Sequence, residues 1–147
     1  MEGAPMRSCG ECSACCRLPE IAEIGKPAST PCKHLCPIGH GCKIYEGRPS
    51  TCSNYECAWL LGHGANADRP DRSGVLIELR QMRRGDGLFA KSYSGEGVNG
   101  DHGRAAIDRA TKSASMACIV SDKNDMEIIR IDGPRQVVRR FRKVYGV

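Results

Sequence analysis

The sequence has few aromatic residues, no long apolar segment and no export signal. Aromatic residues make up 5% of its 147 residues, so few side chains are available to stack on nucleic-acid bases. No window reaches the apolar length of a membrane span. The N-terminal segment, MEGAPMRSCGEC, lacks the hydrophobic region of a secretion signal. We therefore expect a cytoplasmic protein that makes no contact with a membrane.

The sequence also lacks the short motifs of common enzyme classes. It contains no HExxH and no GxSxG, and its glycine-rich segment SGEGVNGDHG is neither a P-loop nor a dinucleotide-binding fingerprint. We find no internal repeat. The sequence therefore indicates a binding protein rather than an enzyme, and no catalytic residue is predicted.

Cysteine, in contrast, is abundant and concentrated in one part of the chain. Ten cysteines occur in 147 residues, and nine of them lie between residues 9 and 57. In a reducing compartment, dense cysteines favour metal binding over disulfides. The CxxC spacing occurs twice in overlap, from Cys9 to Cys12 and from Cys12 to Cys15, and it lets two thiolates approach one ion at about 2.3 Å.

The uneven distribution of cysteine divides the chain into two parts joined by a polar connection. Residues 1–62 are rich in Cys, Gly and Pro, and a bound metal is expected to organise them because they contain little apolar sequence. Residues 63–73 form the connection, and residues 74–147 have the patterning of a small fold. The fold class expected is α+β: an irregular metal-stabilised module followed by a small antiparallel sheet with helices.

The second part contains recognisable strand and helix patterns. Strands are predicted at residues 74–82 and 87–94, as a hairpin, and within residues 116–122 and 126–132. A helix is predicted over residues 101–114. A second helix is expected from Pro134 onward, because Val138, Phe141, Val144 and Tyr145 share one helical face.

The net charge of +5 resides entirely in the second part, since residues 1–62 hold equal numbers of basic and acidic residues. The expected C-terminal helix is strongly basic through Arg135, Arg139, Arg140, Arg142 and Lys143. A basic helix can contact phosphates, but a solvated basic face is the simpler interpretation. We therefore do not predict nucleic acid as the main partner, and this surface would equally suit an acidic protein partner.

Three segments of the first part resemble a known family. CGECSACC, CKHL and GCKIYEGRPSTCSNYEC are similar to the CxxCxxCC, or YkgJ-type, cysteine-cluster proteins, described as putative zinc- or iron-chelating domains. The resemblance covers about residues 9–61. It implies that the metal ligands are Cys9, Cys12, Cys15, Cys16, Cys32, Cys42, Cys52 and Cys57, with Cys36 as a surplus cysteine. Eight thiolates would make two four-coordinate zinc sites with a structural or partner-binding role.

An iron–sulfur cluster is the alternative cofactor. Cys9, Cys12 and Cys15 match the first three ligands of a ferredoxin-type CxxCxxC run, and Cys36 is followed by Pro37, like the cysteine that closes such runs. A cluster of this kind would indicate a redox or metal-handling protein, or an accessory component of a protein-modifying enzyme system. Zinc is preferred here, but residue types alone leave both metals open.

Several neighbouring residues have simpler interpretations than metal binding. His34 and His40 lie among the cysteines but are not needed as ligands. Cys118, in an apolar strand, is expected to be a buried small hydrophobic residue. Cys52 and Cys57 are five residues apart, about 140° around a helix, so they face one ion only if a helix ends between them. The run Trp59–Leu61 is expected to form a miniature core beside the metal.

Overall fold

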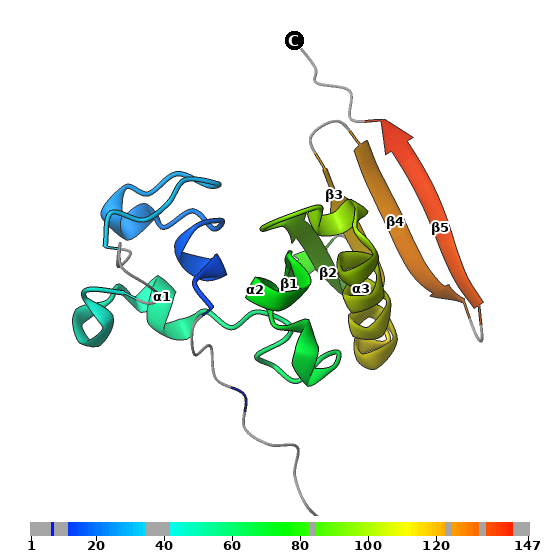
Figure 1. The fold of residues 1–147 in the computed structure, drawn as a ribbon, viewed down its shortest axis with the longest axis horizontal. Helices are drawn as coiled ribbons and strands as arrows, with labels where there is room; N and C mark the ends of the chain where they lie inside the picture. The colour runs from blue at the N-terminus through cyan, green and yellow to red at the C-terminus, as the bar shows by residue number, and fades with distance from the viewer. Residues whose placement is uncertain are drawn as a thin grey trace, which may run out of the picture.

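The computed structural model describes residue 7 and residues 12–34, 42–82, 85–122, 125–132 and 135–142. The chain forms an irregular N-terminal module and a five-stranded sheet with one long helix, so the expected α+β class is confirmed (Figure 1). The strands are β1 (Val75–Met82), β2 (Gly85–Ser92), β3 (Cys118–Ser121), β4 (Asp125–Asp132) and β5 (Arg135–Arg142). They lie in the order β1-β2-β3-β4-β5.

The first four strands and the long helix lie where the sequence predicts them. The helix, α3, spans Asp101–Ala114 and connects β2 to β3. The sheet is mixed and not antiparallel, because β2 and β3 are parallel whereas the other three strand pairs are antiparallel. The crossover helix carries the chain back to the end of the sheet at which β2 began, so β3 runs parallel to β2.

The prediction of a C-terminal helix is wrong. Residues Arg135–Arg142 form strand β5, which pairs with β4 over its full length. In this register Asp125, Glu127 and Asp132 oppose Arg142, Arg140 and Arg135, respectively. Opposite charges on directly opposed residues stabilise a strand pair, and the adjacent β-branched Val137 and Val138 favour a strand over a helix.

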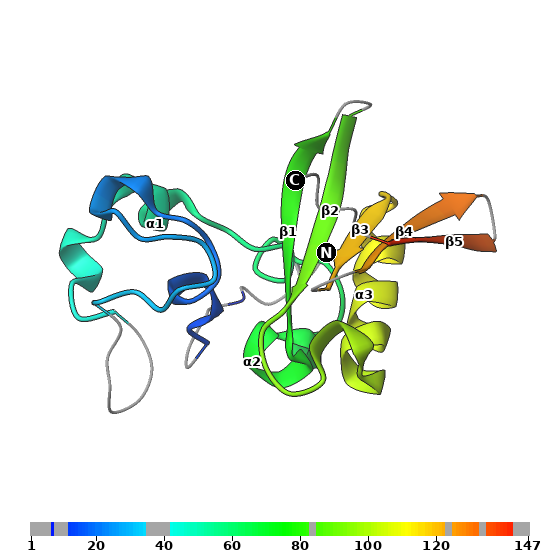
Figure 2. The same cartoon turned by 90° about the horizontal axis from the view of Figure 1, so that it is seen from above.

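The main core lies between α3 and one face of the sheet. Val75, Leu88 and Cys118 are fully buried there against Ile107 of α3, so the prediction that Cys118 is a buried hydrophobic residue is confirmed. The helix approaches the sheet closely at Gly103, where a Cβ atom would lie 2.7 Å from Val75 Cγ2. α3 therefore covers one face of the sheet and leaves the opposite face to other partners (Figure 2).

The N-terminal module consists of short helical turns and loops beside β1. Its elements are η1 (Ala14–Cys16), η2 (Ala22–Ile24), η3 (Tyr45–Gly47) and α1 (Ser50–Asn54). A second, smaller core joins this module to the sheet face opposite α3 through Ala14, Cys57, Trp59 and Leu76. Trp59 therefore forms part of a small core, as expected, whereas Leu61 is 43% exposed.

The connection between the two parts contains short helices packed near α3. They are η4 (Asn66–Asp68) and α2 (Pro70–Ser73), and a further turn, η5 (Gly97–Asn99), precedes α3. Asp68 accepts hydrogen bonds from Arg109 Nε and Nη2 at 2.8 and 2.6 Å, which fixes η4 to the helix. Among the helices that the structure describes, none combines the length and apolar composition needed to cross a bilayer.

Candidate functional site

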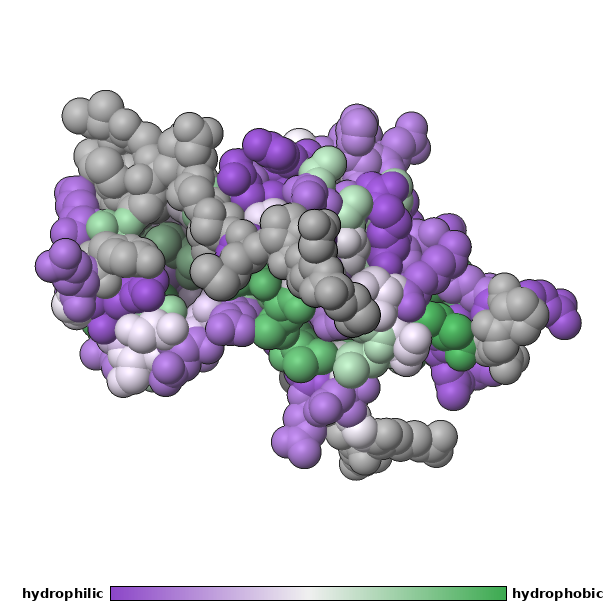
Figure 3. Space-filling model, turned by 90° about the horizontal axis from the view of Figure 1, so that it is seen from below, coloured by the Kyte–Doolittle hydropathy of each residue, from purple (hydrophilic) through white to green (hydrophobic). Residues whose placement is uncertain are grey.

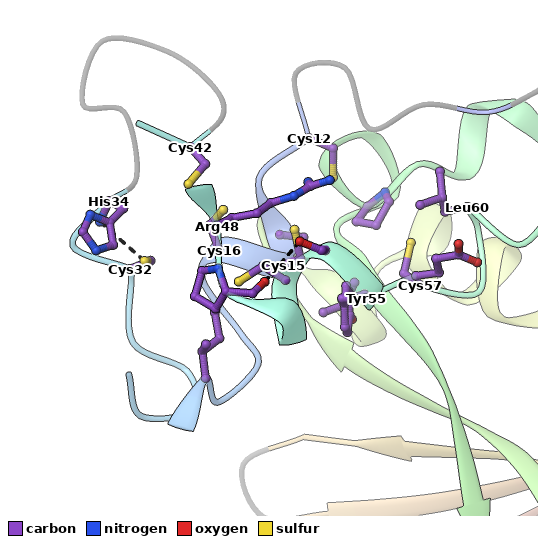
Figure 4. A pocket seen from close by; sticks show the side chains of 18 of the residues that line it. Cys12, Cys15, Cys16, Cys32, His34, Cys42, Arg48, Tyr55, Cys57 and Leu60 are labelled. Atoms are coloured by element: carbon purple, nitrogen blue, oxygen red, sulfur yellow. Dashed lines mark hydrogen bonds between the residues drawn. The ribbon is translucent and has the colours of Figure 1, made fainter. Parts of the chain in front are cut away.

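Seven cysteines of the N-terminal module line one pocket of about 590 Å³ (Figure 4). They are Cys12, Cys15, Cys16, Cys32, Cys42, Cys52 and Cys57. These are all the described members of the predicted ligand set. Cys9, Cys36 and His40 lie outside the described residues. Four sequence segments, spread over some 45 residues, therefore bring their thiols to the same cavity.

The backbone of the module explains how distant cysteines meet. Cys15 and Cys16 lie on η1, and the Cys32 amide donates a 2.8 Å hydrogen bond to the Cys16 carbonyl. The Lys43 amide donates to the His34 carbonyl at 2.7 Å, which brings the segment of Cys42 beside that of Cys32. Three of the segments are thus held together by backbone hydrogen bonds.

Cys52 and Cys57 approach the pocket from different elements. Cys52 lies on α1, which ends at Asn54, and Cys57 lies beyond the helix. The next residue, Ala58, donates its amide to the Ile77 carbonyl of β1 at 2.8 Å. Because α1 ends between these two cysteines, both line the same pocket, although a continuous helix would turn them about 140° apart.

The thiols fall into two groups across the pocket. Burial raises the pKa of Cys52, and the neighbouring thiols of Cys16, Cys32 and Cys42 raise it further. Figure 4 shows Cys32, Cys42 and Cys16 on one side, Cys12 and Cys57 on the other, and Cys15 between them. Cys12 also packs against the small core that contains Cys57.

Cys16 is the thiol most favoured as a thiolate. A hydrogen bond from Cys15 lowers its pKa to about 7, against the effect of burial and with help from the positive charges of Lys26 and Arg17. The thiolate is the form of cysteine that binds metals. The basic neighbours therefore stabilise negative charge in the pocket, as expected of cations beside a thiolate cluster.

Lys26 is a buried cation beside the cysteines. Its side chain is only 5% exposed, and Nζ donates to the carbonyl oxygens of Arg17, Pro19 and Pro27. Burial lowers the pKa of Lys26, while the nearby thiols of Cys32 and Cys16 act to raise it. This ring of carbonyls holds a positive charge where thiolate charge accumulates.

Glu23 fixes α1 from a remote part of the chain. Its carboxylate accepts hydrogen bonds from the Ser50 and Thr51 amides at 3.1 and 2.8 Å, and from both hydroxyls. Backbone amides at a helix N-terminus lack partners within the helix, and a carboxylate there is favourable. Glu23 thus anchors the helix that carries Cys52.

Arg7 fastens the N-terminal segment to the loop after Trp59. Its guanidinium donates to the carbonyl oxygens of Trp59, His63 and Gly64 at 2.7, 3.0 and 2.8 Å. The same group lies 5.1 Å from the centroid of the Trp59 ring. This contact fixes the chain two residues before Cys9 in sequence.

Tyr55 links the pocket to the sheet. Its hydroxyl donates a 3.1 Å hydrogen bond to Glu78 of β1, and burial raises its pKa. The sequence analysis missed Tyr55, Glu23, Lys26 and Arg7. Their partners are distant in sequence or are backbone carbonyls, so no local pattern identifies them.

The histidines have minor roles among the described residues. His34 lines the pocket, and its backbone amide donates to Cys32 Sγ at 3.4 Å. His63 lies within 3.4 Å of Ser113 Oγ, and His102 is exposed on α3. Within the described residues, no three Cys, His, Asp or Glu side chains stand in an arrangement that holds a metal ion as they are placed.

The pocket therefore offers seven thiols, one of which has a lowered pKa, together with cationic and apolar lining residues. No family profile, curated protein or solved structure matches this chain.

Proposed function

We propose that this protein binds zinc through its cysteine cluster and that the metal has a structural or partner-binding role. The observation that supports this proposal is the meeting of seven thiols from four segments in one pocket. Soft all-thiolate surroundings suit zinc. Structural zinc sites with four cysteines are closed and contribute directly to folding. The resemblance to cysteine-cluster domains points the same way.

The two groups of thiols suggest how the ligands divide. Cys16, Cys32, Cys42 and Cys52 would form one four-cysteine site, because the first three lie close enough to Cys52 to raise its pKa. Cys12, Cys15 and Cys57 would supply three ligands of the second site, with Cys9 as the fourth. Modest side-chain rotations on metal binding would complete both sites, since the backbone already brings the segments together.

The metal would replace the hydrophobic core that the module lacks. The buried residues of its own core are few, and most belong to the contact with β1. Lys26 would offset part of the negative charge of eight thiolates, as would Arg17 near Cys16. The zinc-loaded module would then present a fixed surface to a protein partner.

Elemental analysis with a visible spectrum tests this proposal. The full chain would be purified without oxygen and without a metal-binding tag. About two zinc ions per chain and no colour are expected for two closed sites. Iron with matching sulfide and a brown colour would replace the zinc proposal with an iron–sulfur cluster. Absence of both metals, together with unchanged folding after chelation, would overturn both.

Single cysteine variants test the division of ligands. Cys42→Ala and Cys12→Ala should each lose about one zinc ion per chain, and the double variant should lose both. Cys118→Ala is the matched control because Cys118 is buried in the sheet core and remote from the pocket. Loss of both ions in either single variant would show that the thiols form one shared cluster and not two sites.

A further inference from the structure

The sheet face opposite α3 carries an apolar strip bordered by positive charges. The paired residues Glu78, Phe89, Ile119, Ile128 and Arg139 form one row across all five strands. Phe89, Ile119 and Ile128 are half-buried although α3 lies on the other face. We call this surface the open face. It is defined by this row and by the flanking residues Arg80, Lys91, Arg130 and Val137.

Among the described residues, the cysteine module contacts the open face at its β1 end. Leu76 is buried in the small core of the module, and Glu78 accepts the Tyr55 hydroxyl. Arg80, Arg130 and Arg139 are exposed beyond it. The part of the sheet from β2 to β5 therefore presents its side chains on a face that α3 does not cover.

Positive charges outnumber negative ones among the described side chains of the open face. Arg80, Lys91, Arg130 and Arg139 come from four different strands. Among its described side chains, Glu78 is the only acidic one, and it already binds Tyr55 and Arg80. No described carboxylate forms an ion pair with Arg130 or Arg139. These cations are thus available to neutralise negative charge on a ligand.

The arginines of β5 illustrate the difference between the two faces. Arg140 points to the α3 side and lies 3.6 Å from Glu127, which also binds Arg104. Its neighbour Arg139 opposes the apolar Ile128 on the open face. A helix would have placed both on a broad basic surface, whereas the strand sends them to opposite faces.

Phe89 lies within the positive border. The Arg80 guanidinium lies 4.3 Å and the Lys91 ammonium 5.5 Å from its ring centroid. Aromatic rings and guanidinium planes are the surfaces on which unpaired bases stack. The four strands from β2 to β5, about 4.8 Å apart, also span about 14 Å, which accommodates a few nucleotides of an extended strand.

From this arrangement we propose that the open face binds single-stranded nucleic acid. The cations contact the phosphates, and Phe89 with the Arg80 guanidinium stacks against bases. An apolar strip with interspersed cations suits this ligand better than an acidic peptide, which offers charge but no planar rings. On the side of the molecule seen in Figure 3, hydrophobic residues gather near the middle and in a smaller area toward the right, among hydrophilic ones.

Fluorescence anisotropy with the full chain tests this proposal. The probes are a labelled 12-nucleotide single strand of mixed sequence, as RNA and as DNA, and a duplex of the same length. Binding of the single strands is expected with a dissociation constant of about 10⁻⁶ to 10⁻⁴ M, weakening as salt rises. Comparing the affinities for RNA and DNA shows which of the two nucleic acids the open face prefers. No anisotropy change at 10⁻⁴ M protein, or equal binding of the duplex, would overturn the proposal.

Matched charge variants locate the binding face. Arg130→Gln with Arg139→Gln should weaken binding about tenfold and reduce the dependence on salt. Arg140→Gln with Lys112→Gln removes the same charge from the α3 side and should change binding less than about twofold. Both control residues are exposed and make only surface ion pairs. Equal losses in the two pairs would show non-specific attraction and overturn the assignment.

Phe89 variants test stacking separately from charge. Phe89→Leu should weaken single-strand binding about tenfold, whereas Phe89→Tyr should retain it. Circular dichroism of both variants confirms that the sheet is intact. A glutamate-rich peptide of equal charge is the competing ligand. Tighter binding of that peptide, or full binding by a folded Phe89→Leu variant, would show that the open face recognises acidic protein segments instead.

Discussion

Asp68 and Lys26 are buried charged groups with different partners. Lys26 is surrounded by backbone carbonyls in the module. Asp68 accepts the guanidinium of Arg109 and the amide of Ala65, the latter at 2.8 Å. Since a buried charge is costly without partners, both residues are expected to be sensitive to substitution. Asp68 is the clearer case because it does not adjoin the thiols.

Asp68→Asn should lower stability in a pH-dependent way. Burial acts to raise the pKa of Asp68, but hydrogen bonds from Arg109 and Ala65 lower it overall. A lowered folded-state pKa stabilises the fold above the ordinary pKa of about 3.9, and this stabilisation disappears as the pH falls through the folded-state pKa. The variant should therefore lose about 1–2 kcal/mol at pH 7, and the deficit should shrink below about pH 4. Urea unfolding between pH 3 and 7 measures it.

Asp108→Asn provides the control for Asp68. Asp108 is half-exposed on α3 and pairs with Lys112 four residues later. Such surface pairs contribute less than about 0.5 kcal/mol, so little change is expected at any pH. A constant deficit for Asp68→Asn from pH 7 to pH 3 would contradict the role assigned to its charge.

Thiol reactivity should separate Cys118 from the pocket cysteines. Burial raises the pKa of Cys118 to about 12, and thiolate is the reactive form. At pH 8 an alkylating reagent should therefore modify pocket cysteines of the metal-free protein and leave Cys118 intact. Zinc should protect the pocket cysteines. Peptide mass spectrometry after a timed reaction measures the extent of alkylation at each cysteine.

The reactivity of Cys118 also tests the stability of the core between α3 and the sheet. Modification of Cys118 as rapidly as the pocket cysteines would mean that the core between α3 and the sheet opens readily. Unchanged modification of the pocket cysteines with excess zinc would contradict their assignment as ligands.

At the scale of elements, β5 shows where sequence patterns become ambiguous. The segment RQVVRRFR places Val138 and Phe141 at helical spacing, whereas its adjacent β-branched Val137 and Val138 favour a strand. Periodicity alone does not distinguish a helix from a strand for this segment. The acidic residues of the preceding strand favour a strand here, because the antiparallel register places them opposite the arginines. Comparing charges between adjacent segments would have identified the hairpin.

The sequence predicts which cysteines make up the site, but it does not predict which contacts hold them in place. The cysteine spacing indicates the ligand set, because CxxC carries its chemistry in local sequence. The groups that hold the cysteine segments in place act over long distances, as Glu23 does on Ser50 and Thr51. Nothing in a single sequence relates a glutamate to amides 27 residues away. These contacts become visible only when the segments are placed in space.

Glu23→Ala should weaken zinc binding through α1. The variant removes the acceptor for the Ser50 and Thr51 amides, so α1 and its Cys52 lose their anchor. Loss of a helix-terminus acceptor usually weakens a helix, and about fivefold weaker zinc affinity is expected. Competition with a chromogenic chelator measures the affinity. Glu20→Ala, an exposed residue three positions earlier, is the matched control.

Two outcomes would contradict the role of Glu23. Equal affinity in Glu23→Ala and the natural protein would show that α1 needs no anchor to present Cys52. Equal losses in Glu23→Ala and Glu20→Ala would attribute the effect to the net charge near the pocket.

At the scale of the whole molecule, two cores of different kinds are joined at β1. The sheet core is continuous and apolar, from Val75 through Ile107 to Ile129. The module contributes a small core at Leu76 and a pocket of thiols. One part is stabilised mainly by hydrophobic burial, whereas the other is proposed to need metal. The two parts should therefore respond differently to the same treatment.

Removal of zinc should unfold the module and leave the sheet folded. In hydrogen exchange with mass spectrometry, a strong chelator should abolish the exchange protection of amides in peptides covering residues 12–34 and 42–57. Peptides of β1, β2 and α3 should keep theirs, because their amides belong to the sheet core and not to the pocket. The Ala58 amide should report the junction, since it binds the Ile77 carbonyl. Loss of protection in both parts together would show that the small core at Leu76 makes the molecule a single cooperative unit, and retained protection in the module would mean that its hydrogen bonds suffice without metal.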